Sequence, residues 1–172
     1  QVDNRCRNSG TKDGLVGNEL RNKTVGIIGM GGCGSRLAEI MKAFDCRVIF
    51  SVPHVRDNML KLGEPFDMDT LLRESDIISL HCPLTEETRG LIGKEEIAKM
   101  KKTAILINTS RGPVVDSDAL AEALNGHRIA GAGIDVFETE PPINEGHPLL
   151  NAENCIVTPH VAFATKESMI KR

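Results

Sequence analysis

Three glycines at the spacing G-x-G-x-x-G are the first residues whose pattern points to chemistry: Gly29, Gly31 and Gly34. They follow the short apolar segment 25–28 and precede apolar residues at helical intervals, which predicts a strand-to-helix turn. The amides that begin such a helix, with the positive end of its dipole, attract phosphate groups. The pattern therefore favours a dinucleotide-binding turn; the alternative is a plain tight turn.

Each glycine of this motif has a separate physical task. Gly29 can adopt the sharp turn, because glycine tolerates positive φ. Gly31 has no side chain to keep a pyrophosphate away, and Gly34 lets the helix lie close to the strand. A dinucleotide would then bind across the turn, over the start of the helix.

Other candidate residues follow the remaining predicted strands. In chain order they are Cys82, Thr109, Ser110, Arg111, Asp135, Glu140 and His160. An arginine, a carboxylate and a histidine can thus converge over a bound dinucleotide. Each also has an ordinary interpretation: Arg111 can anchor a loop, Glu140 can be a solvated charge, and a lone histidine such as His160 is more often structural. Their shared position after strands favours the functional interpretation.

The elements that must position these residues alternate along the chain. Six apolar segments predict strands, at 25–28, 46–50, 76–80, 103–108, 129–136 and 155–158. Helical patterns run to Phe44, from a cap at Asp69 to Glu74, over 94–100 and over 116–124. This alternation predicts an α/β fold of the Rossmann type, a doubly wound parallel sheet of about six strands with helices on both faces. Its ligand is expected beyond the carboxyl ends of the strands.

Composition narrows the class of protein. A chain of 172 residues suits one domain, and its net charge of -3 gives no long-range attraction to nucleic acid or to an anionic membrane. The five cysteines are odd in number and form no C-x-x-C pair, which is typical of a reducing compartment and predicts no metal site. No apolar run reaches membrane-spanning length, and no signal-peptide pattern is present. We therefore expect a cytoplasmic protein.

The two ends of the sequence suggest a division of the chain. Residues 1–22 are polar with little periodicity and are expected to be a lead-in segment closed by Leu15, Val16 and Leu20. Residues 23–172 are expected to form the dinucleotide-binding domain. The sequence opens without Met and closes within an apparent helix, so both ends are interpreted as cuts in a longer protein.

Several ordered motifs together resemble one known family. They are GLVGNELRNKTVGIIGMGGCGSRLAEIMKAF, SLHCPLTEETRGLIG, LINTSRGPVVDSDAL, GIDVFETEPP and TPHVAFATKES. The chain is similar over nearly its whole length to the nicotinamide-binding domain of the D-isomer-specific 2-hydroxyacid dehydrogenases, which include D-3-phosphoglycerate, D-lactate and glycerate dehydrogenases. The resemblance implies an oxidoreductase that uses NAD and a small 2-keto or 2-hydroxy acid, and a homodimer is expected. The family's substrate domain has no counterpart in this chain, so the fragment alone is expected to be inactive.

The resemblance also assigns roles to residues. Arg111, Glu140 and His160 match the family's catalytic residues, and Arg111 and His160 also stand among its cofactor contacts. Gly32 and Cys33 match the turn over the pyrophosphate. The remaining matched cofactor contacts are Cys82, Thr109, Ser110 and Asp135, with Asp135 near the nicotinamide amide.

These residue types suit the implied reaction. A protonated His160 can donate a proton to the keto oxygen and take it back in the oxidation direction. A carboxylate from Glu140 within hydrogen-bond reach would orient the ring and favour the imidazolium. Arg111 can hold the substrate carboxylate or keto oxygen through paired N–H groups.

Two positions depart from the family pattern. Val52 stands where NAD-binding members usually carry an acidic residue that binds the adenosine ribose, and His54 and Arg56 lie nearby. NAD remains the expected cofactor, with NADP as the alternative. Phe163 stands where a small residue is commoner, and it can narrow the substrate pocket or pack behind the cofactor.

A second class of function is compatible with the same residues. Transcriptional corepressors that resemble this family sense NAD and keep the arginine, glutamate and histidine. An NAD-sensing binding protein without metabolic turnover is therefore the alternative hypothesis.

Overall fold

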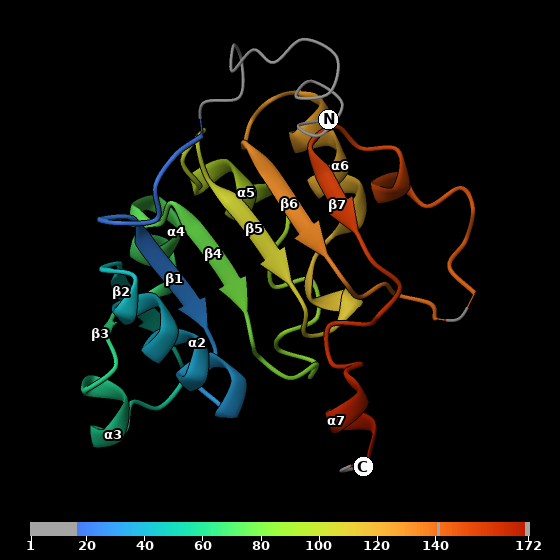
Figure 1. Ribbon diagram of the computed structural model, residues 1–172. Helices are drawn as coiled ribbons and strands as arrows, with labels where there is room; N and C mark the ends of the chain where they lie inside the picture. Colours follow the sequence, from blue (N-terminus) through green and yellow to red (C-terminus); the bar gives the residue numbers. More distant parts are fainter. Residues whose placement is uncertain (1–16, 141, 171–172) are drawn as a thin grey trace, which may run out of the picture.

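A parallel sheet of seven strands forms the centre of the computed structural model, which describes residues 17–140 and 142–170. The strand order is β3-β2-β1-β4-β5-β6-β7 (Figure 1). In chain order the strands are β1 (Thr24–Ile28), β2 (Arg47–Ser51), β3 (Glu64–Pro65), β4 (Ile77–Leu80), β5 (Ile105–Asn108), β6 (Gly131–Ile134) and β7 (Cys155–Val157). The order reverses between β1 and β4, so the carboxyl ends of these two strands flank a topological switch point. The predicted doubly wound parallel sheet is confirmed.

Helices lie on both faces of the sheet. The helix α2 (Gly32–Ala43) packs on β1 and β2 from one face, whereas α4 (Met68–Glu74), α5 (Lys94–Lys99) and α6 (Ser117–Asn125) form the layer on the other (Figure 1). Shorter elements are α3 (Asp57–Leu60), α7 (Lys166–Ile170) and the 3-10 turns η1 (Gly112–Val114) and η2 (Pro148–Leu150). Among the described residues, none of these helices has the length and apolar character that crossing a bilayer requires.

Alternate residues of β1 belong to two hydrophobic cores. Val25 and Ile27 pack with the cluster on the α2 side, and Ile28 joins the larger cluster on the α4–α6 side. Between them, Gly26 leaves room for α4: a Cβ at this position would lie 2.1 Å from Ser75 Oγ and 2.8 Å from Leu71 Cδ2. The gap in this apolar strand is therefore what allows the helix to approach it.

The expected number of strands was too low by one. The missing strand is β3, which pairs with β2 through Ile49 and Phe50 and continues into a hydrogen bond from Phe66 N to Phe50 O. Glu64 and Pro65 are both exposed and are poor strand formers, so no sequence pattern marks them. Backbone pairing along the sheet edge, not side-chain preference, creates this strand.

The cap assigned to α4 was also wrong. Asp67, not Asp69, is the N-cap, and its carboxylate accepts a hydrogen bond from the Thr70 amide at 2.8 Å. Asp69 lies in the first turn instead, where it pairs with Lys99 Nζ at 2.7 Å and with Arg73. Both aspartates fit the sequence preference for a helix start, so residue type alone does not distinguish the cap from the first-turn position.

The predicted lead-in segment lies partly outside the described residues, which begin at residue 17. From there to β1 the chain forms no helix or strand. Its last residues are bound to the turn before β2: Asn22 N donates to Asp45 O at 3.0 Å, Arg21 pairs with Asp45 at 2.8 Å, and Cys46 Sγ donates to Leu20 O. The sequence had predicted Cys46 inside this strand, but the residue lies one position before β2.

The glycine turn offers a test of this packing. A Cβ on Gly34 would lie 2.1 Å from Gly29 O, whereas a Cβ on Gly31 would meet nothing within 4 Å. We predict that Gly34→Ala lowers the free energy of unfolding by about 1–3 kcal/mol, because the helix start cannot move away from β1 without disturbing both. Gly31→Ala is the matched control and should change it by less than about 0.5 kcal/mol. Urea titration followed by circular dichroism measures both. A stabilised Gly34→Ala variant, as helix propensity alone would give, contradicts the close approach.

Candidate functional site

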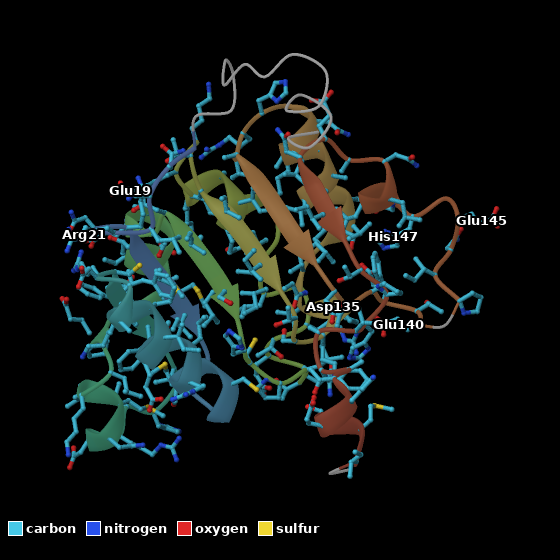
Figure 2. The ribbon with its side chains drawn as sticks, viewed as in Figure 1. Glu19, Arg21, Asp135, Glu140, Glu145 and His147 are labelled. Carbon is cyan, nitrogen blue, oxygen red and sulfur yellow. The ribbon has the colours of Figure 1, made fainter. Side chains whose placement is uncertain are left out.

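The predicted reactive residues gather where the strands end. A cavity of about 470 Å³ lies there. Figure 2 shows Asp135 and Glu140 beyond the carboxyl ends of β6 and β7, with Glu19 and Arg21 at the opposite end of the sheet. The residues that line the cavity are Thr109, Arg111, Asp135, Glu140, Ile143, Pro159, His160, Ala162 and Phe163. Loops from three neighbouring strands, β5, β6 and β7, therefore build one site.

Glu140 and His160 form a hydrogen-bonded pair within this cavity. Glu140 Oε2 lies 2.5 Å from His160 Nδ1, and the side chains are 21% and 39% exposed. Because a carboxylate can only accept, Nδ1 carries the proton of this hydrogen bond. The other carboxylate oxygen of Glu140 accepts from the backbone N–H of Phe137. The ring is thus oriented through Nδ1, and Nε2 is the nitrogen that can exchange a proton with a substrate.

Asp135 holds the loop that carries His160. Its side chain accepts hydrogen bonds from Thr158 Oγ1 at 2.5 Å and from the amides of Val161 and Ala162 at 2.9 Å each. The residue is only 3% exposed. Burial on its own raises the pKa of the Asp135 carboxyl, but these hydrogen bonds outweigh it and hold that pKa below its ordinary value. Asp135 is ionised and acts as the anchor of the β7 loop.

The backbone at His160 has an uncommon conformation. Its φ is 53°, in the left-handed region that residues other than glycine rarely occupy. The conformation is held by the His160 amide, which donates to Asp135 O at 2.7 Å. Strain of this kind persists only where the surrounding contacts impose it, and it concentrates at functional sites.

The loop that carries Arg111 is organised by a buried amide. Asn108, 1% exposed at the end of β5, accepts from Ser110 N and Ser110 Oγ at 3.0 and 2.9 Å and donates to Arg111 O at 3.0 Å. Gly112 allows this loop to touch the next one, because a Cβ there would lie 2.0 Å from Phe137 C. The exposed guanidinium of Arg111 donates to Ser110 O at 2.6 Å.

The glycine turn forms the other part of the candidate site. Gly29 has a φ of 97°, and its amide donates to Ser51 O at 3.1 Å, so the turn lies against the end of β2. The N-cap of α2 is Gly31, with no side-chain cap and no acidic residue in the first turn. The first amides of this helix are therefore available to an anion, and the open space beside Gly31 admits one. This geometry fits a dinucleotide phosphate.

The remaining predicted contacts differ in their surroundings. Cys33 is exposed in the first turn of α2, whereas Cys82 is 9% exposed and packs in the core beside Gly29, where burial raises the pKa of its thiol. Val52 follows β2 directly and is partly buried against the α2-side core. None of these residues lines the cavity that holds Glu140 and His160. The structure thus separates the predicted set into a turn region and a reactive cavity.

Sequence reasoning missed the role of Asn108 and left the role of Phe163 open. Asn108 was treated only as a strand residue, although a buried amide at a strand end is a signal for loop anchoring. Phe163 lines the cavity, and its ring meets that of His160 edge to face with the centroids 5.4 Å apart. In the described part of the chain, no three His, Cys, Asp or Glu side chains gather closely enough to hold a metal ion.

Comparison with known proteins identifies the family and the fold of the chain. Residues 1–162 match the family model of the D-isomer specific 2-hydroxyacid dehydrogenase, NAD binding domain. A glyoxylate reductase of Aeropyrum pernix is 52% identical over 159 residues, which are 91% of this chain and 47% of that protein. The chain therefore spans about half the length of this curated relative.

Solved structures show the same fold. The NAD-complexed D-isomer specific 2-hydroxyacid dehydrogenase of Lactobacillus delbrueckii ssp. bulgaricus aligns with a TM-score of 0.85 at 36% identity, over 97% of this chain and 56% of that one. An acyclic imino acid reductase in complex with NADPH and D-Arg aligns with a TM-score of 0.89 at 35% identity, over 99% of this chain and 54% of that one.

The Asp135 anchor predicts a pH-dependent effect on stability. Asp135→Asn should lower the free energy of unfolding at neutral pH by about 2 kcal/mol or more, because an amide cannot accept all these hydrogen bonds. The pKa of Asp135 is lower in the folded state, so its contribution is complete above the ordinary aspartate pKa, about 3.9, and is lost as the pH falls through the folded-state value. The difference in the free energy of unfolding between wild type and Asp135→Asn should therefore become smaller in acid.

Urea titrations at a series of pH values measure this difference. The exposed Glu86, which lies outside the helices, supplies the control, and Glu86→Gln should change stability by less than about 0.5 kcal/mol. A difference for Asp135→Asn that is absent at neutral pH, or that grows in acid, would show that the carboxylate does not hold the loop.

Proposed function

The chain belongs to the D-isomer specific 2-hydroxyacid dehydrogenase family as an NAD-binding domain, and we propose that it serves an enzyme that interconverts a D-2-hydroxy acid and its 2-keto acid. The observation that carries this proposal is the Glu140–His160 pair, whose carboxylate and imidazole meet at 2.5 Å inside a cavity that Arg111 also lines. These are the groups that a carbonyl reduction requires: an acid for the oxygen and a cation for the substrate carboxylate.

The reactive residues divide the work of the reaction. His160 holds the proton that goes to the keto oxygen and recovers it in the reverse direction. Glu140 keeps the ring oriented and stabilises the imidazolium, and Arg111 binds the substrate carboxylate or keto oxygen. The bound nicotinamide supplies or accepts the hydride. Asp135 and Asn108 take part by holding the loops of His160 and Arg111.

The residues that would hold the dinucleotide lie in two groups. The first is the turn formed by Gly29, Gly31, Gly32, Cys33 and Gly34, whose amides would receive the pyrophosphate. The second belongs to the loops after β4, β5 and β6: Cys82, Thr109, Ser110 and Asp135, together with Arg111 and His160. The carboxyl end of β2, where Val52 lies, would face the adenosine ribose.

NAD is the cofactor that the family model names, and the choice between NAD and NADP depends on the residues after β2. Val52 can neither accept from ribose hydroxyls nor repel a 2′-phosphate. His54 and Arg56 are exposed beside it. We propose NAD as the main cofactor, with NADP admitted by the absence of a carboxylate at position 52.

The rest of the proposal concerns the whole protein. The substrate is a small 2-keto or 2-hydroxy acid, the second wall of the cleft comes from a substrate domain outside residues 23–172, and the working assembly is a cytoplasmic homodimer. The relatives reported above carry enzyme names, so they do not support the corepressor-like alternative.

The first test is turnover. The full-length protein is assayed with glyoxylate, hydroxypyruvate, pyruvate and 3-phosphohydroxypyruvate, each with NADH and NADPH. His160→Ala should lower kcat by roughly 10²–10⁴-fold and weaken dinucleotide binding far less, because proton transfer belongs to the chemical step. The 172-residue chain alone should bind the dinucleotide with little turnover. Binding without turnover by the full-length protein on every substrate would favour the sensing alternative.

The second test is cofactor choice. Val52→Asp should raise NAD affinity by about tenfold, because one charge-assisted hydrogen bond contributes roughly 1.5–3 kcal/mol, and it should weaken NADP binding by charge repulsion. Calorimetric titration with both cofactors measures the change. As a control, replacing His54 and Arg56 with Ala should weaken NADP alone if they hold a 2′-phosphate. An unchanged NAD to NADP affinity ratio in Val52→Asp would mean that position 52 does not face the ribose.

A further inference from the structure

A second glutamate–histidine pair lies in the loop that carries Glu140. Glu138 Oε2 is 2.8 Å from His147 Nε2, and Ser117 Oγ donates to Glu138 Oε1 at 2.5 Å. The His147 side chain is 12% exposed, and its ring packs edge to face on Phe137 with the centroids 4.9 Å apart. Both carboxylate oxygens of Glu138 thus have partners, one on α6 and one at the start of η2.

A backbone amide binds the second ring nitrogen of His147. The amide of Leu149 donates to His147 Nδ1 at 3.3 Å, so Nδ1 is the unprotonated nitrogen and Nε2–H donates to Glu138. The ring of His147 is held on three sides, by a carboxylate, a backbone amide and an aromatic ring. The geometry is that of a structural histidine and differs from that of His160, which lines the cavity.

The same contacts fix the segment from Phe137 to Glu140. Phe137 is 5% exposed, and its amide donates to Glu140 Oε1. The backbone of Phe137 and Glu138 lies against Gly112, where a Cβ would come within 2.0 Å. Glu138 is therefore attached at both sides only two residues before the carboxylate that pairs with His160.

We infer that Ser117, Glu138 and His147 are positioning residues for the reactive pair, an inference that rests on the proposed function. They hold the irregular loop between β6 and η2 so that the Glu140 carboxylate reaches His160. Figure 2 shows three residues of this loop. Glu140 lies near the carboxyl ends of the strands, His147 lies on the side of the loop that faces the molecule, and Glu145 points away from the molecule. Supporting contacts of this kind set the geometry on which a reactive group depends.

Two substitutions of Glu138 separate position from charge. In Glu138→Gln the side-chain oxygen can still accept from His147, and its amide can donate to Ser117 Oγ, so the attachment survives without the charge. Glu138→Ala removes both. Ser117→Ala removes one hydrogen bond and should give an intermediate effect. Glu145→Ala is the matched control, because Glu145 is an exposed glutamate of the same loop.

The first readout is the His160 ring in the 172-residue chain, observed by nitrogen-15 NMR. The Nδ1 proton bound to Glu140 should be observed in wild type, Glu138→Gln and Glu145→Ala, and should be lost or broadened in Glu138→Ala. Glu140→Gln replaces the hydrogen-bond partner of this proton, so the signal that changes in this variant is assigned to His160 Nδ1. If Glu138→Ala does not fold, the Ser117→Ala variant decides between the outcomes. A Nδ1 signal that is unchanged in Glu138→Ala, or in Ser117→Ala where only that variant folds, would overturn the inference.

The second readout is turnover in the full-length enzyme. Glu138→Ala should lower kcat roughly tenfold or more, with the dinucleotide Kd unchanged, and Glu138→Gln should stay within about twofold of wild type. Equal damage by Gln and Ala would overturn the inference, since Glu138 would then act through its charge. Failure of the proposed function is distinguishable: wild type would show no turnover, while the NMR result would still report on the attachment.

Discussion

The candidate site depends most on the three hydrogen bonds that Asp135 accepts from the β7 loop. A parallel sheet brings the carboxyl ends of its strands to one edge, but it does not determine the conformation of the loops that leave them. Asp135 fixes the conformation of the loop that carries His160. Its carboxylate accepts from Thr158, Val161 and Ala162, and its carbonyl accepts from the His160 amide. The left-handed backbone at His160 is maintained by these contacts, so the orientation of the imidazole follows from a buried charge one strand away.

Close approaches between backbones set the rest of the geometry. Gly34 brings the start of α2 against the turn at Gly29, and Gly112 brings the Arg111 loop against the Glu140 loop. Gly26 does the same for α4 beneath β1. At Gly34 and Gly112 a Cβ would lie about 2 Å from backbone atoms, a distance that only a shift of a backbone segment can relieve. At Gly26 the nearest atoms belong to the Ser75 and Leu71 side chains of the α4 region. The site is therefore assembled from rigid contacts between elements, although its reactive residues stand on loops.

Much of this arrangement was accessible from the sequence, for identifiable reasons. The strand-to-helix turn at Gly29 and the short apolar strands are local patterns. The convergence of Arg111, Glu140 and His160 follows from their common position after parallel strands. What could not be predicted depends on contacts distant in the chain. The strand β3 exists because β2 offers an unpaired edge. Asp67 caps α4 through the Thr70 amide, whereas Asp69 lies in the first turn and pairs with Lys99, 30 residues along the chain. The anchoring role of Asn108 likewise requires knowledge that its amide is buried.

The Glu138–His147 and Glu140–His160 pairs show why residue type alone does not define chemistry. Both pairs have a carboxylate at hydrogen-bond distance from an imidazole, and both lie between β6 and the end of the β7 loop. In the Glu138–His147 pair the second ring nitrogen is occupied by the Leu149 amide, which leaves no nitrogen for proton exchange. In the Glu140–His160 pair the carboxylate takes Nδ1, the ring lines a cavity of about 470 Å³, and Arg111 lines the same cavity. His147 is therefore a structural residue, whereas His160 is placed to donate a proton to the substrate. Because Glu138 stands two residues before Glu140, the Glu138–His147 pair holds the loop in the conformation that the Glu140–His160 pair requires.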